Sequence, residues 1–407
     1  MDKIVVLQIN SVYKIASTGR TSYELCQELE KTGEFSVFTV CKNAETDPEH
    51  TIKIGNEIDY RMHALLSRIS GLPGYYSKKA TIKLIDEIEK LQPDVVHLRN
   101  LHSNHINFPI LLDYLGKNDI ATVITLHDCF SFTGKCVHPS LKNCKAYKQN
   151  CGNCPQLKHS NISWFFDRTK RMLSDKKRLF ESIPRLAVIG VSDWVTNESI
   201  GSLLDCAIIR KTIYNWIDLD IFYPRETHDK PSDLPIVLGV ASHWEESKGY
   251  KEFCKIAREL KNQVQVVLVG DIKKDDKIPE IYYYGVERNT EKLAELYSKA
   301  TVFFNPTKME TFGKVSAEAL ACGTPVVAYN VTANPEIIGS GCGYVVDCND
   351  IDKAIERIKE IVHAGKKVFE TRCVSYVREN FELSKNAKEY ADVYKELIRR
   401  GQLNEKT

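Results

Sequence analysis

Two glutamates, Glu310 and Glu318, are separated by seven residues that include a Phe-Gly pair in the C-terminal third of the chain. The segment before them, 301–305, is short, apolar and rich in β-forming residues, and the segment after Gly313 has the pattern of a helix. When a strand leads through a loop into a helix, the loop lies at the carboxyl end of a parallel sheet, where ligands bind. The spacing therefore predicts a binding loop with a carboxylate at each end.

The start of this helix is suited to an anion. Gly313 lets the backbone approach a ligand closely, and the first N–H groups, at Lys314 and Val315, lack an intrahelical partner. Phosphate is the guest we expect. Glu318 could then accept hydrogen bonds from sugar hydroxyls beside the phosphates, and Glu310 could do the same for a second sugar. An ordinary amphipathic helix with two solvated glutamates is the alternative.

Two other predicted strands end in residues that could do chemistry. Lys248 precedes Gly249, and an ammonium group beside a closely approaching backbone fits a diphosphate, although an exposed loop lysine is the commoner case. His127 and Asp128 close a buried-looking strand, where an α/β sheet presents functional groups. His127 could accept a proton or polarise a hydroxyl, and a purely structural histidine is the alternative.

A cysteine-rich loop, 129–154, has no hydrophobic pattern of its own. Its thiols Cys136, Cys144, Cys151 and Cys154 could hold a structural Zn²⁺, which would order a loop with little core. Free thiols or disulfides are the alternatives. The absence of an export signal indicates a reducing compartment, which disfavours disulfides.

Strands and helices alternate along the chain, which indicates an α/β protein with doubly wound parallel sheets. The polar, proline-bounded segment 224–235 has the character of a linker. We expect two Rossmann-like domains that face a central cleft. Residues 1–223, completed by a C-terminal helix at 386–407, would form the first domain, and residues 224–385 would form the second domain.

Composition restricts the function classes. The 407 residues are 43% hydrophobic and 27% charged, which is typical of a soluble globular protein. The 56 basic and 54 acidic residues give a net charge of only +2, so no nucleic-acid partner is expected. We find no apolar run that could span a membrane and expect a cytoplasmic protein, with peripheral contact at the inner face of the membrane left open.

The order and spacing of these motifs resemble the group 1, or family 4, retaining glycosyltransferases of GT-B fold. The cysteine-rich loop resembles that of a branch associated with surface polysaccharide synthesis. The matching segments, spread over nearly the whole chain, are Gly19, Thr125 to Asp128, Val191 to Trp194, Asn215 to Pro224, Lys248-Gly249, Glu310 to Glu318, Ala319 to Pro325 and Pro335 to Ile337.

The resemblance implies a nucleotide-diphosphate sugar as the donor substrate. Lys248 and the backbone of Gly313, Lys314 and Val315 would hold the diphosphate, and Glu318 would bind the ribose. Electrostatic stabilisation of the departing phosphate would then supply most of the catalysis.

The remaining assignments also come from the resemblance. Glu310, with the backbone of Phe312 and Gly313, would position the donor hexose, and His127 would orient it across the cleft. Gly19 matches the glycine of an N-terminal loop that approaches donor phosphate or acceptor. Ser242 departs from the pattern, because the family usually has an arginine there.

The resemblance therefore implies a retaining hexosyltransferase that acts without a catalytic metal in surface polysaccharide or glycan assembly. Residues 1–223 would be its acceptor domain, to which the helix 386–407 crosses back, and residues 224–385 its donor domain. Its partners would be a nucleotide sugar and a saccharide or lipid-linked saccharide acceptor. Two alternatives stay open. One is a GT-B sugar-nucleotide epimerase or hydrolase, and the other is a non-catalytic, zinc-stabilised GT-B binding protein.

Overall fold

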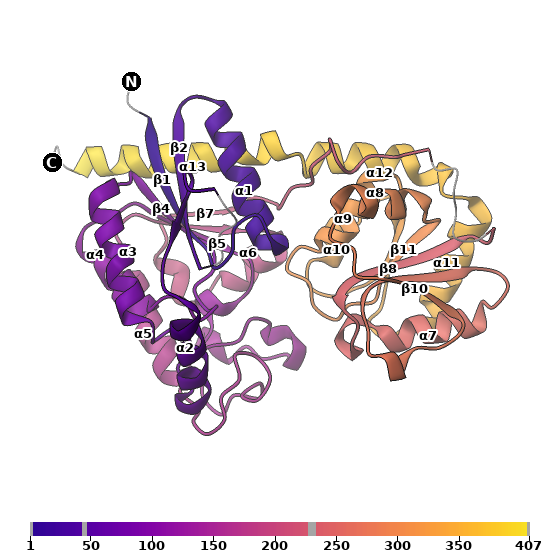
Figure 1. Cartoon of the computed structure of the whole chain (residues 1–407), viewed down its shortest axis with the longest axis horizontal. Helices are drawn as coiled ribbons and strands as arrows, with labels where there is room; N and C mark the ends of the chain where they lie inside the picture. The colour runs from indigo at the N-terminus through magenta and orange to yellow at the C-terminus, as the bar shows by residue number, and fades with distance from the viewer. Residues whose placement is uncertain (1–2, 43–46, 227–232, 405–407) are drawn as a thin grey trace. The chain divides into compact units, whose positions relative to one another are not determined.

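The computed structural model describes residues 3–42, 47–226 and 233–404, and these form two compact units (Figure 1). Unit 1 comprises the chain up to Ile213 together with the C-terminal segment from Leu383, and unit 2 comprises Tyr214–Glu382. The sequence placed its domain boundary at 223/224. The middle of the expected linker, 227–232, lies outside the described residues.

Within the described residues, unit 1 has a seven-stranded parallel sheet of order β3-β2-β1-β4-β5-β6-β7. Its strands are β1 (Ile4–Ile9), β2 (Phe35–Cys41), β3 (Thr51–Lys53), β4 (Val95–Leu98), β5 (Thr122–Leu126), β6 (Leu186–Gly190) and β7 (Ile209–Thr212). Its helices are α1 (Ala16–Lys31), α2 (Glu57–Ser70), α3 (Lys78–Leu91), α4 (Phe108–Lys117), α5 (Thr169–Glu181), α6 (Asp193–Ser199) and α13 (Leu383–Asn404). The strand order reverses between β1 and β4.

In the described part of unit 2, six strands form a parallel sheet of order β10-β9-β8-β11-β12-β13. Its strands are β8 (Ile236–His243), β9 (Gln265–Asp271), β10 (Ile281–Gly285), β11 (Val302–Asn305), β12 (Val326–Tyr329) and β13 (Gly343–Val346). Its helices are α7 (Tyr250–Glu259), α8 (Thr290–Lys299), α9 (Lys314–Ala321), α10 (Asn334–Ile337), α11 (Ile351–Ala364) and α12 (Lys367–Asn380). Here the strand order reverses between β8 and β11.

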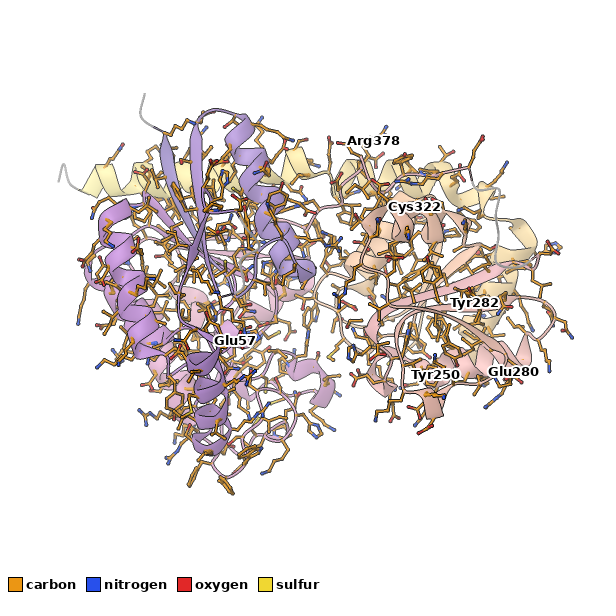
Figure 2. The ribbon with its side chains drawn as sticks, in the orientation of Figure 1. Glu57, Tyr250, Glu280, Tyr282, Cys322 and Arg378 are labelled. Atoms are coloured by element: carbon orange, nitrogen blue, oxygen red, sulfur yellow. The ribbon has the colours of Figure 1, made fainter. Side chains whose placement is uncertain are left out.

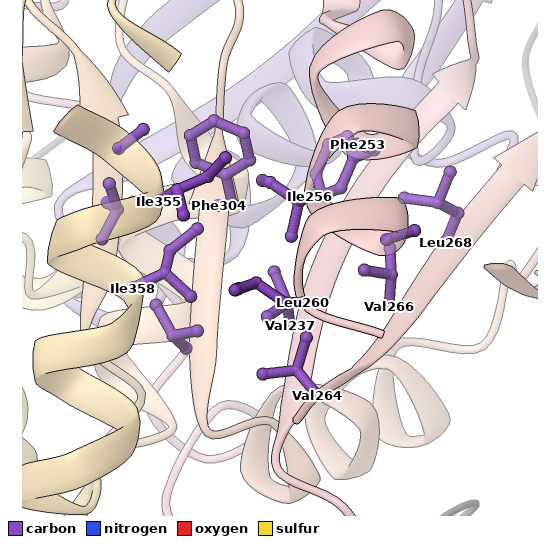
Figure 3. Close-up of a cluster of buried hydrophobic side chains, with 14 of the residues drawn as sticks. Val237, Phe253, Ile256, Leu260, Val264, Val266, Leu268, Phe304, Ile355 and Ile358 are labelled. Carbon is purple, nitrogen blue, oxygen red and sulfur yellow. The ribbon is translucent and has the colours of Figure 1, made fainter. Parts of the chain in front are cut away.

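The core of unit 2 lies between its sheet and the helices α7 and α11 (Figure 3). Val237 and Phe304 from neighbouring strands pack there with Phe253 and Ile256 of α7 and Ile358 of α11, all of them buried. This packing holds the ends of β8 and β11 in place beneath the candidate site. The expected fold class, two Rossmann-like α/β halves, is confirmed.

Helix α13 belongs to unit 1, where it runs alongside α1 (Figure 1). Tyr394 on α13 is hydrogen-bonded through its hydroxyl to His97 Nδ1 at 2.8 Å, and Tyr390 to Thr125 Oγ1 at 2.9 Å. These buried bonds attach the last helix to the ends of β4 and β5.

Some elements differ from the expectation. Helix α2 and the edge strands β3 and β13 were not predicted from the sequence. The resemblance placed Gly19 in an N-terminal loop, but it lies within α1, whose N-cap is Ile15. The Lys14 N–H donates to the Gly19 carbonyl at 3.1 Å, so the first turns of the helix lie against the turn that precedes it. A Cβ on Gly19 would lie 3.1 Å from Val12 Cγ2.

Candidate functional site

The loops that follow β8 and β11 meet at the point where the strand order of unit 2 reverses, the usual ligand position in such sheets. Lys248, after β8, places its Nζ 3.3 Å from Glu310 Oε1 and 3.4 Å from Thr307 Oγ1, both after β11. The backbone N–H of Lys308 donates to the Ser247 carbonyl at 3.3 Å. The structure thus brings together two predicted site residues that are 62 positions apart.

Gly249 makes this approach possible. Its φ is +76°, and a Cβ there would lie only 2.3 Å from Pro306 Cγ. A side chain at 249 would therefore push the Lys248 loop away from the end of β11.

The loop between β11 and α9 is fixed by its neighbours. The N–H of Glu310 donates to Thr332 Oγ1 at 2.8 Å, and the N–H of Ala333 donates to the Glu310 carbonyl at 3.3 Å. The Phe312 side chain is buried and packs edge-to-face on Phe381, with ring centroids 5.2 Å apart. Phe312 is therefore an anchor, and only its backbone is available to a ligand.

Gly313 is the N-cap of α9, with φ +84°. Its carbonyl accepts from the N–H groups of Ser316 at 2.9 Å and Ala317 at 3.3 Å, which begins the helical pattern. The N–H groups at the start of a helix have no intrahelical acceptor, and the helix dipole adds partial positive charge there. Lys314, the first residue of α9, adds a full positive charge. An anion is therefore favoured at this end of the helix.

Asn334 is a site residue that the sequence did not reveal. Its Oδ1 is buried, has no hydrogen-bond partner among the described residues, and would lie 3.6 Å from a Cβ on Gly313. Its Nδ2 donates to the Tyr329 carbonyl at 3.1 Å, which fixes the direction of the amide. A buried acceptor without a donor is costly, so a donor group supplied by a ligand would be stabilised beside Gly313.

Glu318 lies deeper in α9 and is 1% exposed. The hydroxyl of Tyr297 on α8 donates to its Oε2 at 3.1 Å. Asn305 Nδ2 donates to Ser316 Oγ at 2.9 Å, which joins the end of β11 to the first turn of α9. The hydrogen bond from Tyr297 holds the Glu318 carboxylate in one orientation, which suits it to accept a hydrogen bond from a bound hydroxyl.

The departure at Ser242 lies at the exposed end of β8. His243 beside it is exposed, with Nε2 3.7 Å from Asp271 Oδ2. The positive charge expected at this point is absent, whereas Lys308 and Lys314 add positive charge in the β11–α9 loop. The sequence analysis gave Lys308 no role, although its position inside the predicted binding loop could have marked it as a possible contact for an anion.

In unit 1, His127 directly follows β5 and is half-buried. Asp128 accepts a hydrogen bond from the Phe130 N–H at 2.7 Å, and its other oxygen lies 3.6 Å from His102 Nε2. The sequence missed His102, because this histidine lies in an irregular segment with no recognisable motif.

His97 is fully buried near the end of β4. Its Nε2 lies 2.7 Å from Thr125 Oγ1, and its Nδ1 contacts Tyr394. Burial lowers the pKa of His97 well below its ordinary value, so the imidazole is neutral. His97 is thus part of the attachment of α13 and has an architectural role.

The four predicted zinc ligands, Cys136, Cys144, Cys151 and Cys154, line one small pocket. The sulfurs of Cys136 and Cys154 are 3.8 Å apart. Four thiolates at about 2.3 Å from a tetrahedral zinc ion lie about 3.8 Å from one another, so this pair has the required separation. A hydrogen bond from Cys136 lowers the pKa of the Cys154 thiol to about 6.

Two buried lysines hold the cysteine-rich loop. Lys176 of α5 donates to the Thr133 carbonyl at 2.9 Å and lies over the Phe130 ring, 3.5 Å from its centroid. Lys135 donates to the carbonyls of Leu157 at 2.9 Å and Asn161 at 3.0 Å. Burial lowers the pKa of both lysines, to about 7 for Lys176, and nearby thiolates raise it. The charge of −2 on a zinc ion with four thiolates would therefore favour the charged form of both lysines.

Among the described residues, only Cys26, Glu30 and His50 of unit 1 form a group of three or more metal-ligating side chains whose ligand atoms all lie within 4.8 Å of one another. The four cysteines of the loop do not meet this criterion, and the group in unit 1 was not predicted. His50 lies between two carboxylates, 3.0 Å from Glu30 and 2.8 Å from Asp47, and the hydrogen bond to Asp47 raises its pKa. These contacts form an ion-pair cluster outside the sites predicted from the sequence.

No helix in residues 3–42, 47–226 and 233–404 has the length and apolar character needed to cross a bilayer.

Residues 224–380 match the family model described as "Glycosyl transferases group 1". A relative from Escherichia coli K12, "Putative colanic acid biosynthesis glycosyl transferase WcaC", is 24% identical over 67% of this chain and 69% of its own. For the next relatives the match spans about half of their length, between 46% and 54%.

Solved structures with the same fold cover nearly the whole chain. Sucrose-phosphate synthase from Thermosynechococcus elongatus superposes with a TM-score of 0.70 at 19% identity, over 98% of this chain and 100% of that one. HepE from Anabaena, solved with UDP, superposes with a TM-score of 0.63 at 15% identity, over 97% and 100%.

Proposed function

We propose that the chain is a group 1 glycosyltransferase of GT-B fold that transfers a hexosyl unit from a nucleotide-diphosphate sugar to a saccharide acceptor with retention of configuration. The observation that carries this proposal is the meeting of Lys248, Glu310 and Gly313 at the switch point of unit 2, with the buried Glu318 in the helix behind them.

The diphosphate would bind at the start of α9. There the N–H groups of Gly313, Lys314 and Val315 and the ammonium group of Lys248 all favour negative charge. When the leaving phosphate develops charge during transfer, the same fixed donors stabilise it without having to reorganise.

Each carboxylate has a separate proposed role. Glu318, fixed by the Tyr297 hydroxyl, would accept hydrogen bonds from the ribose. Glu310 would position the hexose, and it pairs with Lys248 when no donor is bound. Donor binding would therefore exchange the partner of Lys248 from a carboxylate to a phosphate.

The remaining roles rest on the family resemblance. His127 is proposed to orient the transferred hexose, and Gly19, in the first turns of α1, to approach donor phosphate or acceptor. Because the proposed donor site stabilises the leaving phosphate with N–H groups and lysines, we propose that catalysis needs no metal.

We also propose a structural Zn²⁺ held by Cys136, Cys144, Cys151 and Cys154. The spacing of Cys136 and Cys154, the shared pocket and the two buried lysines support it. The ion would order the loop and take no part in the transfer.

The acceptor we propose is a saccharide carried on a lipid, which implies peripheral contact with a membrane surface. The names of relatives such as the capsular polysaccharide glycosyltransferase CapM of Staphylococcus aureus are consistent with surface polysaccharide assembly.

The test is a thermal-shift screen against UDP-, GDP- and ADP-sugars, followed by turnover with the best binder. We expect one class to raise the melting temperature and to bind at least tenfold more weakly to Glu318→Gln, because the ribose loses its charged acceptor. The matched control is Glu356→Gln, an exposed glutamate of α11 that pairs with Lys353. An unchanged Kd in Glu318→Gln would refute the assignment of the ribose site.

A further inference from the structure

Helix α2 has its polar and apolar faces reversed relative to a core helix. Its buried side chains are Tyr60, His63 and Ser67. Four apolar side chains are exposed instead, at spacings of four, three and four residues that place them on one face of the helix: Ile58, Met62, Leu65 and Ile69. Ile58 is 74% exposed.

Specific polar contacts fix this orientation. His63 Nδ1 lies 2.8 Å from the Ser77 hydroxyl, and His63 Nε2 accepts a hydrogen bond from the Gly74 N–H at 3.1 Å. The Asn56 side chain caps the first turn by accepting from the Asp59 N–H at 3.0 Å. Turning the apolar face inward would break the bonds of a buried histidine, so the exposed stripe belongs to the native fold.

An aromatic turn extends the stripe. Trp164, Phe165 and Phe166 follow one another and are all exposed, Phe165 by 68%. The Trp164 N–H donates to the Arg68 carbonyl of α2 at 2.7 Å. A Cβ on Gly71, which caps α2, would meet the Phe166 carbonyl oxygen. The stripe and the turn therefore form one continuous surface, which we call the α2 face.

Basic side chains surround the α2 face. Six exposed cations lie on α2, next to the aromatic turn or at the start of α5: Arg61, Arg68, Lys158, Arg168, Lys170 and Arg171. Arg168 stacks over Phe166, 5.2 Å from the ring centroid, and Lys158 donates to the Trp164 carbonyl.

The carboxylates nearby are fewer, namely Glu57, Asp59, Asp167 and Asp175, and Asp175 lies 3.5 Å from Arg171. Asp167 accepts hydrogen bonds from the N–H groups of Cys154 at 2.7 Å and Thr169 at 2.9 Å. Glu57, labelled at the start of α2 in Figure 2, lies 4.0 Å from Arg61. The apolar centre of the α2 face is thus surrounded by net positive charge.

This chemistry fits a lipid surface. A helix with one apolar face and flanking Lys and Arg lies in the plane of a bilayer interface, and Trp is enriched at that depth. A helix of this length covers about 21 Å, enough to lie flat and too short to span. A protein partner would also need an apolar face, but six cations around it are better matched by anionic headgroups.

We propose that the α2 face binds unit 1 to the surface of a membrane that contains anionic lipids, with α2 in the interfacial plane and Trp164 to Phe166 inserted among the headgroups. The inference deepens the lipid-linked acceptor and membrane contact proposed above. It concerns binding alone and does not depend on turnover.

The test is flotation of the full chain with two kinds of vesicle, phosphatidylcholine alone and an equal mixture of phosphatidylcholine and phosphatidylglycerol. We expect binding to the anionic vesicles that weakens as salt is raised, because salt screens the basic side chains. In Ile58→Ser/Phe165→Ser the partition coefficient should fall at least tenfold, because two inserted apolar groups are lost.

The matched control is Val368→Ser on α12. Val368 is an aliphatic residue that is 71% exposed and lies in unit 2, outside the α2 face. The Val368→Ser variant should bind vesicles as well as the wild type does. Since the replaced side chains are exposed, the variants should keep the melting temperature of the wild type, which excludes misfolding as the cause of lost binding.

Three results would overturn the inference. They are a wild type that does not float with anionic vesicles at low salt, a double variant that floats as well as the wild type, and a wild-type dimer in solution that the double substitution dissociates. Nucleotide-sugar binding, measured on the same variants, separates the two proposals. If the vesicle results hold and no nucleotide sugar binds, the proposed function fails and the membrane surface stands.

Discussion

Replacing Lys248 by alanine tests the donor site where two predicted residues meet. In the free protein Lys248 and Glu310 form an ion pair 3.3 Å long, with side chains 32% and 20% exposed. An ion pair this exposed stabilises the fold by no more than about 1 kcal/mol, so the variant should remain folded. A charge-assisted hydrogen bond to a diphosphate is worth about 1.5–3 kcal/mol, which predicts a Kd roughly 10- to 150-fold higher.

The loss also leaves the Glu310 carboxylate without its cation, close to the bound diphosphate. Repulsion between them should add to the loss, so Glu310→Gln introduced into the Lys248→Ala variant should recover part of the affinity. The assay is calorimetric titration with the best-binding nucleoside diphosphate, without its sugar, so that the proposed role of Glu310 toward the hexose does not enter.

The matched control is Lys251→Ala, three residues away. Lys251 pairs with Glu246 at 3.0 Å, and both side chains are more than 70% exposed. Its removal should leave the Kd unchanged. The reasoning is refuted if Lys248→Ala binds the diphosphate like the wild type, or if both lysine variants lose the same affinity.

Three further substitutions test other parts of the account. Gly249→Ala should lower the melting temperature and weaken donor binding, whereas Gly33→Ala, with a similar φ of +75° and open space around it, should affect stability alone. Elemental analysis of the purified chain should find about one zinc ion per chain. The Cys154→Ser variant should lose this ion and the control Cys206→Ser should keep it. A wild type without metal would exclude the site. Burial lowers the pKa of His63 from 6.5 to about 4, so its contribution to stability is present above pH 6.5 and is lost as the pH falls toward 4. Between pH 7 and pH 5 the free energy of unfolding, measured in urea, should therefore fall by about 2 kcal/mol less in His63→Gln than in the wild type. An equal fall in both proteins would contradict a neutral, buried His63.

The sequence was most informative where local pattern and position in the fold agree. The Glu310 to Glu318 segment follows a buried strand and opens a helix, and that order alone places it at the carboxyl end of a parallel sheet. The contact between Lys248 and Glu310 could be expected only from the strand order. It depends on β8 and β11 being neighbours, which the family resemblance implied and local pattern does not reveal.

The sequence was least informative where tertiary contacts override pattern. Ile58, Met62, Leu65 and Ile69 have the spacing of a core-facing helix, yet the hydrogen bonds of His63 turn this face outward. Asn334 and His102 lie outside any motif, and only packing reveals their place. In α2 the deciding factor is the buried His63, which must find hydrogen-bond partners, and the periodicity of apolar residues does not encode that requirement.

The central claim is that the donor binds unit 2 at the start of α9. Hydrogen–deuterium exchange with and without the tightest-binding nucleotide sugar tests it most directly, since the amide groups at the start of a helix lack intrahelical acceptors and exchange readily until a ligand occupies them. We predict slower exchange in segments 242–250 and 308–316 when the donor is bound. Protection confined to unit 1, at a donor concentration that saturates the protein, would contradict the account.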